Sequence, residues 1–200
     1  MNLQKESGMA VSSCRFLHIC VRQYIYYLRK ILPLEMEIQE ETAVKKRSIT
    51  ELLIFIASAE LVGALSGILA GNMKSFYQSL EKPPLAPPGW LFPVMWSILY
   101  AVMGITAYCI YAADGDRKQT IRAYLWYGAQ LGLNFLWSIV FFLFHAVDAA
   151  LVVVLLLIAA VAGMIVSFQR IRPAAGWGNL PYLAWLLFAA YLNFGVWILN

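Results

Sequence analysis

Two stretches of the chain place aromatic rings and carboxamides at intervals of three or four residues, the spacing that puts side chains on one helix face. The first stretch contains Trp126, Gln130, Asn134, Trp137 and Phe141. The second contains Tyr182, Trp185, Ala189, Asn193 and Trp197. Rings offer contact area to a flat apolar ligand, and a few amides orient it. The spacing predicts a pocket between two helix faces that turn toward each other.

Groups for conventional catalysis are sparse. The histidines and cysteines have no metal-ligand spacing and no CxxC pair; they are His18, His145, Cys14, Cys20 and Cys109. No glycine-rich phosphate loop or GxSxG turn is present. We interpret His145 as a loop-capping residue rather than an axial haem ligand. We expect no metal site, no required cofactor and no conventional enzyme.

Glu60 is the one carboxylate well inside a hydrophobic run. A polar group in hydrocarbon is costly unless it is paired. Two interpretations stay open: a proton or ligand contact, or a residue that snorkels or is paired near the middle of its helix.

The composition shows which elements must position these side chains. The chain is 62% hydrophobic and 13% charged, whereas soluble domains are about 25% charged. Five apolar runs are long enough to cross a bilayer as helices: about 52–70, 90–113, 123–144, 147–168 and 180–199. The fold class expected is an all-α integral membrane protein, a bundle of five transmembrane helices formed by residues 49–200.

Charge indicates topology, because Lys and Arg are retained on the cytoplasmic side of a membrane. Most cations flanking the runs fall on the side shared with the N-terminus: Lys45, Lys46, Arg47, Arg117, Lys118, Arg122, Arg170 and Arg172. The opposite side carries Lys74 and Lys82. We predict the N-terminus inside and the C-terminus outside. This placement fits lipid headgroups better than nucleic acid despite the net charge of +4.

Residues 1–48 are interpreted as an N-terminal extension, either a basic amphipathic helix on the membrane surface or a disordered segment. An alternative is that the natural chain starts at Met36.

The link between the first two runs, residues 71–89, is rich in proline. Its prolines favour an extended course across one mouth of the bundle, so we expect a lid. Two small-residue motifs, Gly63-x3-Gly67-x3-Gly71 and Gly128-x3-Gly132, allow close helix packing, either within the bundle or in a homodimer.

The tryptophans divide by position. Trp90, Trp177 and Trp197 lie near the ends of the runs, where interfacial anchors are expected. Trp96, Trp137 and Trp185 lie deeper or beside polar residues, which favours a lining role.

Three stretches carry a resemblance to a known family. They are Phe76–Pro84 continuing through Pro87-Pro88-Gly89-Trp90 to Trp96, then Leu133–Ser138, then Pro181–Trp185 with Phe188-Ala189 and Tyr191-Leu192-Asn193. The chain resembles the translocator protein or tryptophan-rich sensory protein family, also called the peripheral benzodiazepine receptor family. The resemblance covers about residues 49–200. It implies five helices whose first loop covers a cavity for porphyrins and, in some members, sterols and synthetic ligands.

The resemblance also implies roles for matching positions. Tyr77 and Pro87 match lid contacts, and Trp96 and Trp185 match two tryptophans that face the bound ring. Further lining positions match Asn134, Trp137 and Ala189. In bacterial relatives the two tryptophans are implicated in light- and oxygen-dependent breakdown of protoporphyrin, so the resemblance implies that Trp96 and Trp185 are the catalytic residues. The stretch Asn193–Trp197 lacks the Tyr and Arg of the proposed animal cholesterol motif.

The leading hypothesis is a membrane receptor for protoporphyrin-like tetrapyrroles that contacts lipid and no nucleic acid. Two alternatives are a transporter of tetrapyrrole or lipid, although no inverted repeat is visible, and a stress-regulatory sensor that acts through protein partners.

Overall fold

The computed structural model describes residues 49–113 and 115–200. The predicted N-terminal extension lies outside these ranges. In chain order the helices are α2 (Ile49–Leu69), α3 (Met73–Ser79), α4 (Leu91–Tyr111), α5 (Arg117–Ser138), the π-helical turn η1 (Ile139–Leu143), α6 (Val147–Ile171), α7 (Pro173–Trp177) and α8 (Leu180–Leu199).

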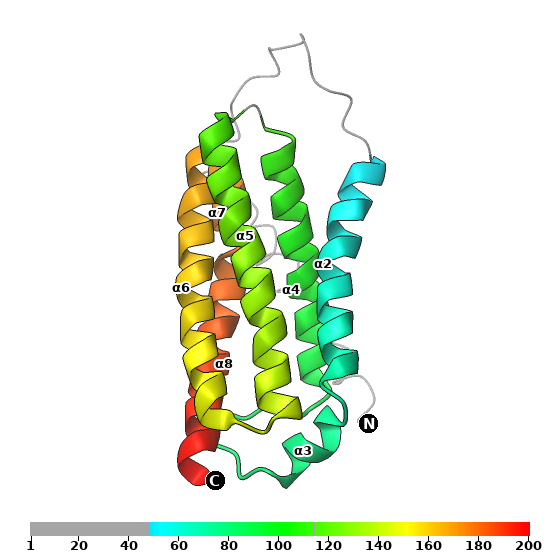
Figure 1. Cartoon of the computed structure of the whole chain (residues 1–200), viewed down its shortest axis with the longest axis vertical. Coiled ribbons are helices and arrows are strands. Elements are labelled where there is room, and N and C mark those ends of the chain that lie inside the picture. Colours follow the sequence, from blue (N-terminus) through cyan, green and yellow to red (C-terminus); the bar gives the residue numbers. More distant parts are fainter. Residues whose placement is uncertain (1–48, 114) are drawn as a thin grey trace, which may run out of the picture. The chain divides into compact units, whose positions relative to one another are not determined.

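Five of the described segments are long and apolar enough to cross a membrane: Ile49–Leu69, Leu91–Tyr111, Arg117–Leu143, Val147–Ile171 and Pro173–Leu199. The predicted all-α fold with five spanning helices is confirmed. These segments run alternately up and down (Figure 1). Most of their large apolar side chains that point away from the bundle are exposed, as lipid contact requires.

The third span begins six residues earlier than the sequence predicts. The carboxylate of Asp116 accepts hydrogen bonds from the backbone N–H groups of Lys118 (3.1 Å) and Gln119 (3.2 Å). This N-cap starts the helix at Arg117. Hydropathy misses the start because the first turns carry charges, which long side chains hold at the membrane surface.

The same span ends in η1, which the sequence does not predict. The backbone N–H of Phe144 bonds to the carbonyl of Ile139 (3.1 Å), five residues back. His145 follows with a left-handed backbone (φ 55°), and α6 begins two residues later. The wider turn brings the end of this span into contact with α3.

Close packing joins α5 to α6, α2 to α4, and α6 to α8. The α2–α4 contact depends on Gly104, where an added Cβ would lie 2.6 Å from the Cα of Ile56. In contrast, α4 and α8 are not among the closely packed pairs, although both are described over their whole length. Side chains must therefore bridge α4 and α8.

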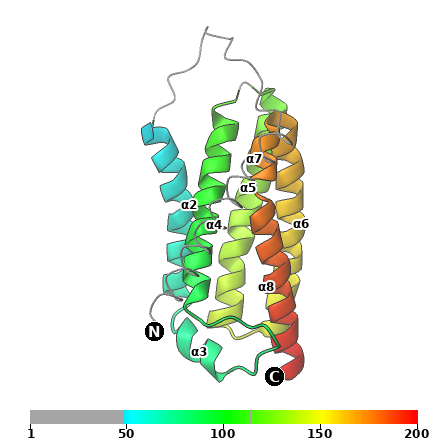
Figure 2. The same ribbon diagram turned by 180° about the vertical axis from the view of Figure 1, so that it is seen from behind.

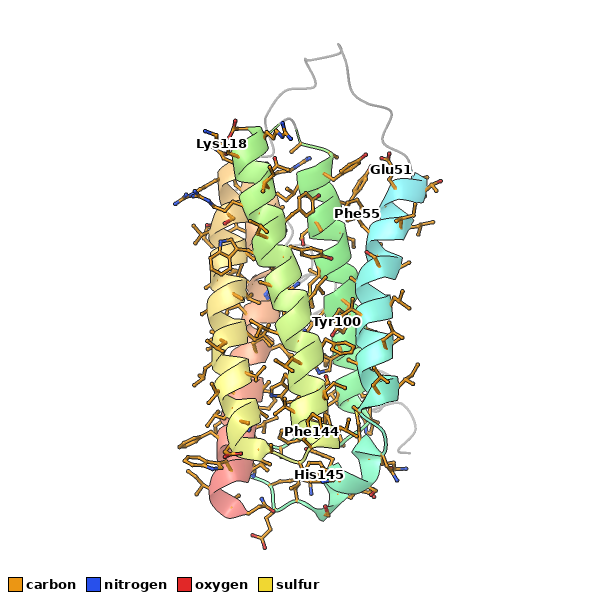
Figure 3. All side chains as sticks on the ribbon, viewed as in Figure 1. Glu51, Phe55, Tyr100, Lys118, Phe144 and His145 are labelled. Carbon is orange, nitrogen blue, oxygen red and sulfur yellow. The ribbon has the colours of Figure 1, made fainter. Side chains whose placement is uncertain are left out.

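The segment between α2 and α4 crosses one end of the bundle, with α3 below the spans and the proline-rich link running toward the end of α8 (Figure 2). Pro83 is buried against Gly195, where an added Cβ would lie 2.5 Å from the proline ring. Lys118 lies at the opposite end of the bundle, the same end as Glu51 in the first turn of α2 (Figure 3).

Candidate functional site

Six aromatic side chains from α3, α4 and α8 form two branches that we call the ring wall: Tyr77, Phe92, Trp96, Tyr100, Tyr182 and Trp185. In the first branch the ring centroids of Tyr77 and Phe92 are 5.2 Å apart, and those of Phe92 and Trp185 are 6.1 Å apart. Both contacts are edge-to-face, a favourable geometry for aromatic quadrupoles. This branch connects the lid helix α3 to α8 through α4.

Trp96 is the centre of the second branch. Its ring centroid lies 5.8 Å from that of Tyr100 and 6.3 Å from that of Tyr182. Trp96 and Trp185 are both half-buried and pack against the main hydrophobic core. The structure therefore turns both of these tryptophans inward.

The indole nitrogen of Trp185 is the notable polar atom of the wall. It is buried and has no hydrogen-bond partner among the residues that the structure describes. A buried donor without an acceptor costs about 1–3 kcal/mol. A bound molecule that offered an acceptor here would recover that free energy. Ala189, one turn later on the same face, is small and buried.

A buried polar chain lies beside the wall. The amide of Asn134 donates to the Tyr182 hydroxyl (3.1 Å), which donates to the Gln130 carbonyl oxygen (2.9 Å). All three side chains are 0–1% exposed. The side-chain amide of Asn134 thus orients the Tyr182 ring, which contacts Trp96 in the wall. The Tyr127 hydroxyl is buried without a partner in the described part of the chain.

Lid contacts hold the wall at its outer end. The Tyr77 hydroxyl donates to the carbonyl of Pro87 (2.8 Å), which brings the two predicted lid residues together. Burial raises the pKa of Tyr77, so its hydroxyl stays protonated and remains a donor at neutral pH. From α8, the Tyr191 hydroxyl donates to the Pro84 carbonyl (2.8 Å). Hydrogen bonds therefore hold the lid segment together and attach it to α8.

Trp137 lies apart from the other two predicted lining tryptophans. It belongs to a second group at the lid end of the bundle, the end cluster, which comprises Phe76, Trp137, Phe141, Phe142 and His145. The Trp137 ring stacks on Phe141 (5.1 Å, 20°), and its N–H donates to Asn193 (3.0 Å). Asn193 in turn donates to the Val147 carbonyl (2.8 Å). The polar groups of Trp137 and Asn193 are used within the protein.

His145 stacks on Phe76 of α3, with centroids 4.0 Å apart and planes 22° apart. Figure 3 shows His145 at the end of the bundle where α3 lies. The stack joins the loop after η1 to the lid helix, which agrees with a capping role.

Sequence reasoning missed Phe92 and Tyr100 as wall residues. With Trp96 they recur every four residues on α4, so the same spacing that marked α5 and α8 was available. Neither carries an amide neighbour, which is why the mixed polar and aromatic pattern did not draw attention to them.

The tryptophans predicted to be interfacial anchors are all exposed: Trp90, Trp177 and Trp197 are 66%, 52% and 50% exposed. Trp126 is 39% exposed, at the bundle periphery. There its ring packs against Gly163 of α6, where an added Cβ would lie 2.9 Å from the indole. It is therefore not part of the inward face predicted for α5.

The two glycine motifs have different surroundings. A Cβ at Gly63 would collide with the ring of Tyr100, so this glycine serves packing between α2 and α4. At Gly128 and Gly132 an added Cβ would meet no atom of the described residues within 4 Å, and both residues are exposed. Glu60 is half-buried on α2.

Comparisons with known proteins agree with this architecture. Residues 55–198 match the TspO/MBR family. Protein CrtK of Rhodobacter capsulatus is 32% identical over 153 residues, which cover 76% of this chain and 94% of that protein. Tryptophan-rich protein TspO of Archaeoglobus fulgidus is 37% identical over 154 residues (76% and 99%), and the human translocator protein is 34% identical over 133 residues (66% and 79%). With five spans in the expected order, the chain is a multi-pass integral membrane protein that belongs to the TspO/MBR family.

Proposed function

We propose that this protein is a membrane receptor for protoporphyrin-like tetrapyrroles, which bind against the ring wall under the proline-rich lid. The single observation that carries the proposal is the indole N–H of Trp185, which is buried without a partner in the described part of the chain, within a wall of rings contributed by three helices. Aromatic faces supply dispersion and apolar contact, and one donor supplies orientation. No metal or cofactor is required for this binding.

Titration of the purified protein with protoporphyrin tests the proposal, with tryptophan fluorescence as the readout. We expect saturable quenching by protoporphyrin and none by a non-planar lipid at the same concentration. Trp96→Phe combined with Trp185→Leu should weaken protoporphyrin binding by about tenfold or more, since one ring and both indole N–H donors are lost. Equal quenching by the flat and the non-planar compound would show that the wall does not select flat rings.

The same two indoles are the proposed catalytic groups for light- and oxygen-dependent breakdown of the bound porphyrin. The support is their inward position on adjacent branches of the wall. We expect the double variant Trp96→Phe, Trp185→Phe, saturated with protoporphyrin, to bleach the porphyrin more slowly under light than the parent. Equal bleaching rates at equal occupancy would leave the protein a receptor only.

The proposed orientation places the N-terminus inside. Lys118 at the start of α5 lies at the same end of the bundle as the start of α2, and the lid lies at the other end (Figure 3). A tag after Asn200 should be digested by protease added to intact cells.

The proposed homodimer uses the outer face of α5, where Gly128 and Gly132 are exposed with room for another backbone. Gly132→Leu should shift the protein toward monomer in cross-linking experiments, while the protoporphyrin affinity stays the same.

A further inference from the structure

Lys82 occupies a defined position at the outer end of the ring wall. Its ammonium nitrogen lies 5.1 Å from the centre of the Tyr77 ring, within the range of a cation–π interaction. The same nitrogen donates to the backbone carbonyl of Leu80 (2.7 Å). Neither contact is with an acidic group, and an ammonium has donors beyond the one that Leu80 takes. The charge is held in place without being neutralised by these contacts.

The backbone on both sides of Lys82 is tied to α8. Glu81 exchanges two hydrogen bonds with the Asn200 side chain, N–H to Oδ1 (3.0 Å) and Nδ2 to the Glu81 carbonyl (3.0 Å). Pro83 is buried against Gly195. Although the Lys82 side chain is exposed, its base is fixed relative to the helix that carries Trp185.

A continuous path of rings joins two polar groups of the site, the Lys82 ammonium and the Trp185 indole N–H. It runs from the Lys82 ammonium over Tyr77 to Phe92 and ends at the buried Trp185 N–H. The cation lies in the link that precedes α4, outside the spans, where an ionised carboxylate keeps contact with water. The apolar rings lie between, inside the bundle. A matching ligand is flat, apolar over its body, anionic on one edge and able to accept a hydrogen bond further in.

We infer that Lys82 is the carboxylate contact of the site, and that the site selects planar apolar acids, flat ring systems with carboxylates on one edge. This inference rests on the proposed function and deepens it. Protoporphyrin, which carries two propionates on one edge, has this chemistry. Its dimethyl ester keeps the ring system and removes both charges, so the pair of compounds isolates the contribution of the carboxylates.

The experiment titrates the full-length protein with protoporphyrin and with its dimethyl ester, and compares the parent with Lys82→Gln. We expect Lys82→Gln to weaken binding of the free acid by about tenfold, equivalent to about 1.4 kcal/mol. Binding of the ester should change by less than about twofold, because a neutral edge gains little from an ammonium. The matched control is Lys74→Gln, an exposed lysine of α3, which should change neither affinity.

Lys82→Arg separates charge from local structure, since it keeps the cation and should retain most of the affinity for the acid. Equal losses for acid and ester, an equal loss in Lys74→Gln, or no loss in Lys82→Gln would overturn the assignment while the receptor function stands. If the parent bound the ester no better than a non-planar lipid, the receptor function itself would fail, and this inference with it.

Discussion

The ring wall and the end cluster are built from the same kinds of side chain, but their polar atoms are treated differently. In the end cluster the Trp137 N–H is paired with Asn193, and rings stack closely, as Phe76 does on His145. In the ring wall the Trp185 N–H is buried without a partner in the described residues. The rings of the wall meet edge-on across two helices whose backbones stay apart. The end cluster, whose indole N–H is hydrogen-bonded within the protein, is suited to a structural role. The ring wall, whose buried indole N–H meets no acceptor in the part of the chain that the structure describes, is suited to binding a ligand.

The largest expected effect tests whether the end cluster is structural. Phe141 is 4% exposed and contacts three other rings of the cluster. Phe141→Ala should destabilise the protein by about 3–5 kcal/mol, because a buried ring is replaced by a cavity. The measurement is thermal unfolding in detergent. Phe194→Ala, at a ring 46% exposed, is the control and should cost no more than about 1 kcal/mol.

The next largest effects come from the same substitution, Trp to Phe, made at one tryptophan of each cluster. Trp137→Phe removes the donor to Asn193 and leaves a buried amide oxygen unpaired, so it should destabilise the protein by about 1–3 kcal/mol. Protoporphyrin affinity should stay within about twofold of the parent, since the loss is structural. A large loss of affinity with an unchanged unfolding temperature would place Trp137 in the ligand site instead.

Trp185→Phe should show the opposite behaviour. It removes a donor that has no partner in the described chain, so the free energy of unfolding should change by less than about 1 kcal/mol. Affinity for protoporphyrin should fall about two- to tenfold through the lost hydrogen bond to the ligand. If the two Trp→Phe variants lost stability and affinity in the same proportions, the distinction between a structural end cluster and a ligand-binding ring wall would be wrong.

The smallest effect concerns the lid. Tyr191→Phe removes one exposed hydrogen bond to the Pro84 carbonyl, worth about 0.5–1.5 kcal/mol. The unfolding temperature should hardly move, while release of protoporphyrin in stopped-flow experiments should become about two- to tenfold faster as the lid opens more often. Tyr108→Phe, which alters a hydroxyl on α4 outside the lid, is the control. An unchanged release rate would mean that this link does not limit opening.

Much of the architecture follows from hydropathy and local chemistry. Twenty or more apolar residues in a row have no stable alternative to a membrane-spanning helix, so the five spans are local properties of the chain. The Asp116 cap is equally local, because a carboxylate next to unpaired N–H groups starts a helix. The inward position of Trp96 and Trp185 was expected from the family resemblance, and that of Asn134 from its amide in an apolar run.

The amino-acid sequence by itself determined that this protein spans a membrane five times and that the amides of α5 and α8 face inward. Trp126 and Trp197, which the same spacing placed on these faces, are exposed instead. Only the tertiary structure decided which indole finds an acceptor and which glycine faces a ring. Trp137 meets Asn193 from α8, and Gly63 meets Tyr100 from α4, whereas a Cβ at Gly128 would meet no atom within 4 Å among residues 49–113 and 115–200. The reason is physical. Hydropathy and capping act within a few residues, whereas the pairing of a buried donor depends on residues 56 positions apart that come together only when the helices pack.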